Sequence, residues 1–233
     1  MTFRRGRAGT VQPLPWAMLF SDPVAGPAET LVASLRDYPE WHRGRERYGV
    51  WIAPVEEPAL LRYISDVRER LADLIHPSPR RQAHLTVFVC GFHGAGDADD
   101  DFDPDCLARQ VATLSKGSAE ACALPLGNID SFASAAFIPV GDPVGHLQKW
   151  REALGESTRE VRQAGFIPHI TLGLYRRCVT AAVLRQRLGA ISAPPCTLPV
   201  RELHYVTYDA RDQFGPLRTM RRATLQWTSK CVS

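Results

Sequence analysis

Apolar residues recur along the chain at two spacings, and these predict strands alternating with helices. Short apolar runs rich in β-branched residues predict buried strands at 48–55, 84–92 and 169–175. Apolar residues three and four apart predict helices at 29–36, 58–75, 104–116, 144–163 and 180–188. Turn residues separate further strands, which we place at 121–129, 131–140, 202–209 and 218–227.

The order strand, helix, strand occurs twice, which indicates an internal duplication under divergent sequence. A pseudo-two-fold relation between two lobes would bring equivalent positions face to face across a cleft. We therefore predict that residues 48–233 form a single bilobal domain. Residues 1–47 form an N-terminal arm or extension, whose first 30 residues are rich in Gly, Pro and Arg and are expected to be loosely attached.

The same short motif stands at the head of one strand in each half. Residues 83–92 read AHLTVFVCGF and residues 168–177 read PHITLGLYRR, so each contains His, one spacer and Thr. Side chains two residues apart lie on the same face of a strand, so each imidazole has a hydroxyl beside it. A single motif of this kind is most often structural. Its repetition with the same spacing and the same apolar continuation favours a functional interpretation of His84, Thr86, His169 and Thr171.

The amino-acid composition narrows the class of protein to which the chain can belong. The apolar fraction of 45% and net charge of +3 are typical of a globular protein, and no apolar run reaches the roughly twenty residues of a membrane span. From residue 176 onward, ten Lys/Arg oppose three acidic residues, which favours either a polyanionic ligand or a solvated basic surface. The six cysteines are scattered without paired spacing, which indicates free thiols in a reducing compartment. We expect a cytoplasmic protein.

The paired motifs suit acid–base chemistry on a phosphodiester. Near pH 7 one imidazole can accept a proton while another donates one. Two hydroxyls beside them can donate hydrogen bonds to non-bridging phosphate oxygens. This chemistry requires no metal and no cofactor, and neither motif has the further adjacent ligands that a metal site would need.

On these motifs the sequence resembles the two-histidine (2H) phosphoesterase superfamily, in particular its bacterial 2′-5′ RNA ligase-like and cyclic phosphodiesterase branches. The resemblance covers about residues 48–227. It implies a bilobal fold of the α+β class, with pseudo-two-fold duplication, two antiparallel sheets lining a central cleft and helices outside. It also implies metal-independent action on 2′,3′-cyclic phosphates or 2′-5′ linkages, with His84 and His169 as the acid–base pair and Thr86 and Thr171 as phosphate ligands.

The resemblance also implies residues that contact the substrate. An aromatic residue between the motifs often contacts the base in this superfamily, and Phe132 is the matching candidate, with a core position as the alternative. Some members have an arginine soon after the second motif. Strand alternation places Tyr175 and Arg177 on the face of His169, so we prefer Arg177 to Arg176.

Two further features near the start of the domain are open to more than one interpretation. Trp51 and Tyr48 lie on opposite faces of the first strand, and one of them is expected to line the cleft; Trp51 is the candidate that we name. The segment 38–48 mixes aromatic residues with arginines, and it either covers a phosphorylated ligand or packs as a surface loop.

We therefore expect a hydrolase for 2′,3′-cyclic nucleotides or RNA ends, with RNA 2′-5′ ligation as a reverse reaction. The alternatives are an enzyme that cleaves cyclic or 2′-5′-linked oligonucleotide signals, and a non-catalytic module that binds RNA or nucleotides. The expected partner is a nucleotide or RNA, with no role for a membrane, and the expected state is a monomer.

Overall fold

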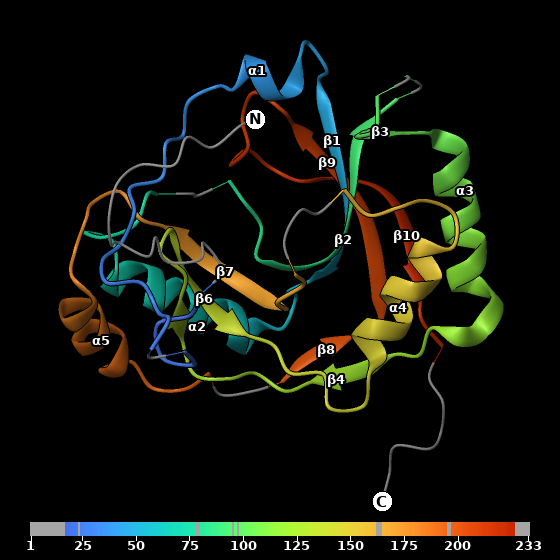
Figure 1. Cartoon of the computed structure of the whole chain (residues 1–233). Helices are drawn as coiled ribbons and strands as arrows, with labels where there is room; N and C mark the ends of the chain where they lie inside the picture. Colours follow the sequence, from blue (N-terminus) through green and yellow to red (C-terminus); the bar gives the residue numbers. More distant parts are fainter. Residues whose placement is uncertain are drawn as a thin grey trace, which may run out of the picture.

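The computed structural model describes residues 17–226 apart from 23, 78–79, 95, 97, 162–164 and 195–196. Within these residues, eight strands form a central sheet in the order β10-β9-β1-β2-β7-β6-β5, with β3 beside β2 (Figure 1). Neighbours along this order are antiparallel, whereas β3 pairs parallel with β2. The strands span Arg47–Pro54 (β1), His84–His93 (β2), Asp101–Phe102 (β3), Asp130–Ser131 (β5), Ala135–Pro139 (β6), His169–Leu174 (β7), Glu202–Asp209 (β9) and Arg218–Thr224 (β10).

The central sheet consists of two halves. One half contains β10, β9, β1 and β2, and the other contains β7, β6 and β5. Among the described residues they are paired at one position, between Leu85 of β2 and Ile170 of β7. The prediction of an α+β fold with antiparallel sheets is confirmed, but the two halves form one hydrogen-bonded sheet through this pair instead of two separate sheets.

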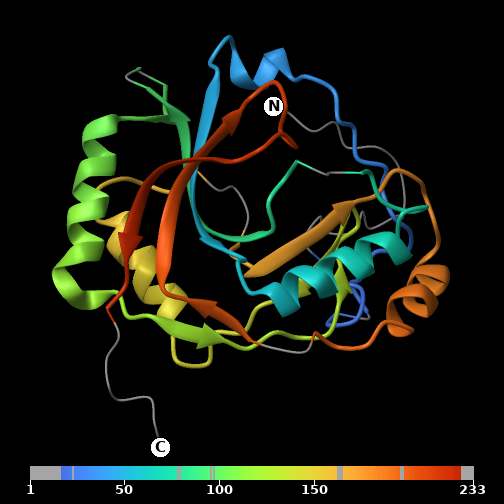
Figure 2. The ribbon, with the colours of Figure 1, turned by 180° about the vertical axis from the view of Figure 1, so that it is seen from behind.

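Helices α2 to α5 lie on one side of the sheet, and each half has its own (Figures 1 and 2). Helix α1 instead packs its Trp41 against Tyr48 and Phe92 on the opposite face. Helices α3 and α4 lie beside the β1–β2 half, while α2 and α5 lie beside β7. The main core lies between sheet and helices and includes Trp51, Trp150 and Tyr205, all fully buried. The helices span Pro39–His42 (α1), Pro58–Arg70 (α2), Pro104–Thr113 (α3), His146–Gly155 (α4) and Ala181–Gly189 (α5), and a π-helical turn, Leu114–Ser118, follows α3.

Local sequence signals explain where the helices begin. Helix α2 starts at Pro58, whose fixed φ suits the first helical position, and buries Leu60, Ile64 and Val67. The Asp103 carboxylate caps α3 by accepting a hydrogen bond from the Asp105 amide. The Thr180 hydroxyl caps α5 in the same way, so sequence signals of this kind predicted these helix starts closely.

The sheet face opposite the helices carries the motif residues of the first half. Ile52 of β1 pairs with Thr86, and Pro54 pairs with His84. Ile52 belongs to a smaller apolar cluster on this face, which also contains Tyr48, Val50, Phe92 and Val206. The first motif therefore lies on a surface bounded by apolar side chains, away from the main core.

Three predicted elements differ from the structure. Residues 29–36 form no helix, because the amides of Leu31 and Ala33 donate to the carbonyls of Ala133 and Tyr175 and hold the segment extended. The predicted strand 121–129 is interrupted, and only its later part lies antiparallel to 131–140, where Leu126 bridges Val140. Its first part becomes β4, Cys122–Leu124, which pairs with β8, Leu198–Val200, in a separate two-stranded sheet. Helix α4 ends at Gly155, earlier than the predicted 163.

The described part of the N-terminal arm packs against the second half of the sheet. Leu19 is fully buried, and its amide donates to the Ser131 carbonyl. The buried Asp130 carboxylate accepts hydrogen bonds from the amides of Phe20 and Ser21 and from the Ser21 hydroxyl. Because of these contacts, the expectation of a loose arm is wrong for residues 17–22. Residues 1–16 lie outside the described part of the chain.

The segment 38–48 packs as a surface loop, one of its two predicted interpretations. The Trp41 ring lies 4.9 Å from the rings of both Tyr48 and Phe92. The Arg45 guanidinium pairs at 2.5 Å with Asp100, in the loop before β3, and at 2.7 Å with Asp101, the first residue of β3. Among the described helices, none is long and apolar enough to cross a membrane.

Candidate active site

Strand pairing brings the two H-x-T motifs together. Each motif histidine is the first residue of its strand, and the spacer residues Leu85 and Ile170 pair antiparallel. Neighbours of an antiparallel pair lie opposite each other in reverse order. His84 is therefore opposite Thr171, and Thr86 is opposite His169, with all four side chains partly exposed. Leu85 and Ile170 point the other way and are fully buried.

The two imidazoles are held in the same manner. Nδ1 of His84 lies 2.8 Å from the Gln82 carbonyl oxygen, and Nδ1 of His169 lies 2.7 Å from the Ile167 carbonyl oxygen. A carbonyl can only accept, so Nδ1 carries the proton in the neutral ring of each histidine. The shared contact with the residue two positions earlier makes Nε2 the atom at which each ring can take up or release a proton.

The surroundings of the two rings differ. Burial, together with the nearby Arg81 guanidinium, lowers the pKa of His84 to about 4. His169 instead has aromatic neighbours, since the Phe132 and Phe137 rings lie 5.2 Å and 5.3 Å from its ring in edge-to-face geometry. The four motif residues are thus arranged symmetrically within an asymmetric environment.

A cavity of about 230 Å³ opens beside three of the four motif residues, and His169 is not in its lining. His84, Thr86 and Thr171 line it together with Arg68, Arg81, Gln213 and Phe214. Residues of β2 and β7, of helix α2 and of the β9–β10 loop all contribute, so both halves of the sheet build this cavity. Sequence reasoning missed Arg68, Arg81 and Phe214, because no motif spacing singles out a helix residue, a turn residue and a loop residue that meet only in the fold.

The structure brings Phe132 to the site. Its ring is partly exposed, contacts His169 and stacks on Phe137 with the ring centroids 4.1 Å apart. It therefore lies beside the second motif, as an aromatic contact for a ligand would have to do. That it contacts a base stays a prediction.

Tyr175 and Arg177 do not lie in the cavity, which corrects the prediction from strand alternation. Tyr175 is fully buried, and its hydroxyl is 2.7 Å from the Ser131 hydroxyl. Arg177 is exposed, and its guanidinium lies 3.9 Å from the Asp73 carboxylate. The cause is a register irregularity: Gly173 pairs with Ala136 but Thr171 pairs with Phe137, so Leu172 is an extra residue and the alternation fails beyond it.

Trp51 is also not a cleft residue. It is fully buried in the main core, and its indole N–H donates to Gln110 Oε1 at 2.7 Å. Tyr48, the alternative, lies on the cleft side of the sheet but packs against Trp41 and Phe92 and is absent from the cavity lining. Neither aromatic residue of β1 contacts the cavity at the motifs.

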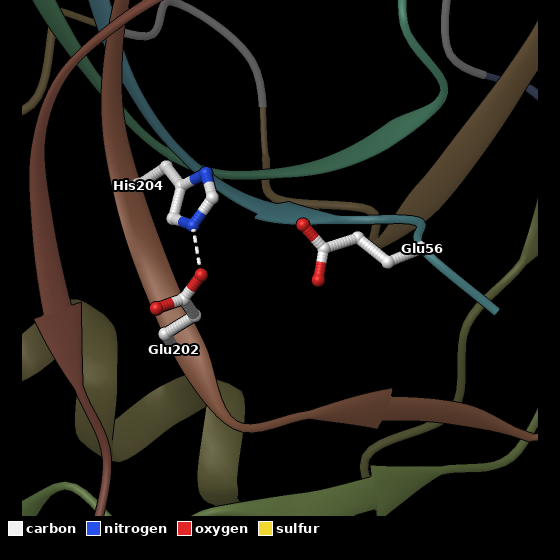
Figure 3. Close-up of side chains that lie close together, drawn as sticks. All are labelled: Glu56, Glu202 and His204. Carbon is white, nitrogen blue, oxygen red and sulfur yellow. Dashed lines mark hydrogen bonds and ion pairs between the residues drawn. The ribbon is translucent and has the colours of Figure 1, made fainter.

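One group of side chains in the described part of the chain has the donors to hold a metal ion (Figure 3). The ligand atoms of Glu56, Glu202 and His204 lie within 4.8 Å of one another. His204 Nε2 is 2.5 Å from Glu202 Oε1, and the Arg222 guanidinium lies 3.6 Å from the same oxygen. Contacts with protein groups thus explain the position of Glu202 and His204 without a metal ion. The group contains neither motif histidine.

Comparison with known protein families shows which family the chain belongs to. Residues 54–212, which include both H-x-T motifs, match the 2′-5′ RNA ligase superfamily. The chain belongs to the 2′-5′ RNA ligase superfamily. The resemblance inferred from the motifs is thereby confirmed at the level of the superfamily. A comparison of this sequence with curated proteins found no match.

Solved structures share the fold of this 2′-5′ RNA ligase superfamily chain. Escherichia coli LigT in its apo form is 14% identical, with 78% of this chain and 99% of LigT covered at a TM-score of 0.54. LigT complexed with 3′-AMP is 17% identical over the same shares at a TM-score of 0.50. A conserved protein of unknown function from Agrobacterium tumefaciens is 14% identical, with 81% of this chain and 90% of that chain covered at a TM-score of 0.55.

Proposed function

We propose that the protein is a metal-independent phosphodiesterase that opens 2′,3′-cyclic phosphates of nucleotides or RNA ends. One observation carries the proposal: the Leu85–Ile170 pair sets two histidines and two threonines diagonally on adjacent strands. Membership of the superfamily and the binding of 3′-AMP by the structurally similar LigT support a nucleotide ligand. The cavity is lined from both halves of the sheet, which supports residues 48–233 working as one bilobal unit.

In the proposed reaction the cyclic phosphate lies between the two motifs. The hydroxyls of Thr86 and Thr171 donate hydrogen bonds to its non-bridging oxygens, where negative charge increases in the transition state. One histidine takes a proton from water at Nε2 as the water oxygen forms a bond to phosphorus. The bond from phosphorus to the 2′ or 3′ oxygen breaks, and the other histidine gives that oxygen a proton from its Nε2. The balance is one water consumed and one phosphomonoester formed.

The asymmetric surroundings of the two histidines support different roles for them. Because the pKa of His84 is lowered to about 4, this ring is neutral at pH 7 and is ready to accept a proton. We therefore propose His84 as the base for hydrolysis and His169 as the acid. Joining RNA ends through a 2′-5′ linkage would use the same roles with a 5′-hydroxyl in place of water. His84 takes the proton of that hydroxyl, the bond from phosphorus to the 3′ oxygen breaks, and His169 gives that oxygen a proton.

The test is hydrolysis of the four nucleoside 2′,3′-cyclic phosphates in EDTA between pH 5 and 9. Replacing either histidine by alanine is expected to lower kcat about a hundredfold or more, the usual contribution of a general acid or base. The control is His93→Gln at the far end of β2, whose ring contacts the Tyr205 hydroxyl and not the cavity. Full activity of His84→Ala or of His169→Ala would refute the proposal.

Because the chain belongs to the 2′-5′ RNA ligase superfamily, the same experiment should also test 2′-5′-linked and cyclic oligonucleotides as substrates. Turnover confined to these compounds, and lost in both histidine variants, would move the function to oligonucleotide signals. Salt-sensitive binding of RNA without turnover of any of them would identify a non-catalytic module instead.

A further inference from the structure

Two arginines that line the cavity carry charge without a carboxylate partner among the described residues. Arg68, on α2, donates its Nε–H to the Leu172 carbonyl at 2.8 Å. Arg81, in the turn before β2, donates to the Gly215 carbonyl at 3.2 Å, and its guanidinium lies 4.5 Å from the centre of the Tyr208 ring. Both side chains are partly buried. These contacts orient the two guanidinium groups but leave both positive charges uncompensated.

Two other partly buried arginines among the described residues are neutralised, whereas Arg185 contacts only the Leu19 carbonyl. Arg45 pairs with Asp100 and Asp101, and Arg151 pairs with Glu160 at 2.6 Å. Burial lowers the pKa of Arg68 and of Arg81, which shows that their charged forms lose hydration in the fold. Asp212 is close enough to favour the charged form of Arg81, but it pairs directly with Arg80 at 2.8 Å. A partly buried and unneutralised guanidinium is unfavourable unless an anion joins it.

The position of the two arginines indicates which anion this is. They line the motif cavity, and they also line a neighbouring cavity of about 680 Å³. That second cavity has apolar walls from Leu61, Ile64, Ile75, Pro77 and Ala83. The arginines therefore line both cavities. One is lined by His84, Thr86 and Thr171, and the other, whose lining also includes Glu69, is large enough for a further nucleotide.

We propose that Arg68 and Arg81 bind a second phosphate of the substrate, one nucleotide away from the phosphodiester held by the motifs. The preferred substrate is then a strand of at least two nucleotides, which is bound more tightly than a mononucleotide. Guanidinium groups suit this role because their fixed N–H donors match phosphate oxygens. The inference rests on the proposed function for the identity of the first phosphate.

A binding experiment tests the second phosphate without turnover. Calorimetry compares adenosine 3′-monophosphate with adenosine 3′,5′-bisphosphate, whose additional phosphate lies on the side of the preceding nucleotide. Wild type is expected to bind the bisphosphate about tenfold more tightly or better, as for a charge-assisted hydrogen bond. Arg81→Gln and Arg68→Gln are expected to remove this preference while leaving the affinity for the monophosphate within about twofold.

The chain offers matched controls. Arg80 adjoins Arg81 in sequence but is exposed and paired with Asp212, and Arg62 is exposed on the same helix as Arg68. Arg80→Gln and Arg62→Gln should keep the preference for the bisphosphate. Circular dichroism checks that each variant is folded, and the single change Arg81→Gln suffices if Arg68→Gln unfolds.

A kinetic experiment separates a strand from a free bisphosphate. Arg81→Gln is expected to reduce kcat/KM for a dinucleotide ending in a 2′,3′-cyclic phosphate to the value for the mononucleotide. Equal losses on both substrates, or equal affinity of wild type for the two adenosine phosphates, would overturn the proposal. A preference for the bisphosphate without any hydrolysis would refute the proposed function and leave the second phosphate site standing.

Discussion

Leu85 and Ile170, the spacer residues of the two H-x-T motifs, pair with each other across β2 and β7. This pair joins the halves of the central sheet and sets each histidine opposite the threonine of the other motif. Two fully buried side chains thus control the arrangement of four polar ones on the opposite face.

Truncation of this pair should affect stability and activity together. Ile170→Ala is expected to reduce the free energy of unfolding by about 2–5 kcal/mol, since it removes buried methyl groups and leaves a cavity. Ile170→Val should reduce it by only about 0.5–1.5 kcal/mol. Urea denaturation measures both values. If kcat stays at the wild-type level in folded Ile170→Ala, the pair does not position the motifs.

The lowered pKa of His84 predicts the acid limb of the activity profile. Because kcat/KM reports the free enzyme, its acid midpoint should lie near 4 and not near the ordinary value of about 6.5. Arg81→Gln removes a nearby positive charge and should move the midpoint upward, whereas Arg80→Gln should leave it in place. An NMR titration of the His84 ring in the absence of ligand checks the assignment.

The same shift makes stability depend on pH. A histidine with a folded-state pKa of about 4 binds fewer protons in the folded than in the unfolded state between about pH 4 and 6.5. The contribution of His84 to stability is therefore complete above pH 6.5 and is lost as the pH falls toward 4. Denaturation at pH 4.5 and 7 should show a smaller difference for His84→Gln than for wild type, and equal differences would contradict this.

Asp130 should anchor the N-terminal arm. Its carboxylate accepts hydrogen bonds from Phe20, from Ser21 and from the Ser131 amide, and it is almost fully buried. Asp130→Ala leaves these donors without their acceptor and should reduce the free energy of unfolding by about 2–3 kcal/mol. Limited proteolysis should cut first near residues 20–33. Asp66→Ala, exposed on α2, serves as the control and should change neither result.

Gly91 of β2 is a position where only glycine fits. Its φ is +108°, and an added Cβ would lie 2.3 Å from the Asp100 carbonyl oxygen. Gly91→Ala should therefore reduce the free energy of unfolding by about 2–4 kcal/mol through backbone strain and a steric clash. At Gly189 nothing lies within 4 Å of an added Cβ, so Gly189→Ala should have little effect. Thermal unfolding compares the two variants.

Phe132 is predicted to stack on the substrate base. Phe132→Ala should then lower kcat/KM for nucleoside cyclic phosphates by roughly tenfold to a hundredfold, the usual effect of losing one base–aromatic contact. A five-membered cyclic phosphodiester without a base should lose much less. Equal losses on both compounds would indicate that Phe132 acts only by holding His169.

The motif residues could be predicted from sequence because a strand's period of two fixes which side chains share a face. The same rule failed for Tyr175 and Arg177, where the extra residue Leu172 breaks the period. It could not decide the face of Trp51, because β1 is apolar on both sides and the choice depends on where the helices pack. The strand period could not predict Arg68 and Arg81, because they approach the cavity from a helix and a turn.

The diagonal arrangement has a consequence for the regiochemistry of the reaction. Antiparallel strands look alike after half a turn, so a cyclic phosphate rotated by half a turn would meet the same four side chains in the same order. The residues around the motifs differ, however, with guanidinium groups near His84 and aromatic rings near His169. In the proposed reaction, residues outside the motifs would therefore decide which of the two ester bonds opens. Exchanging only these neighbours would change the isomer that is released.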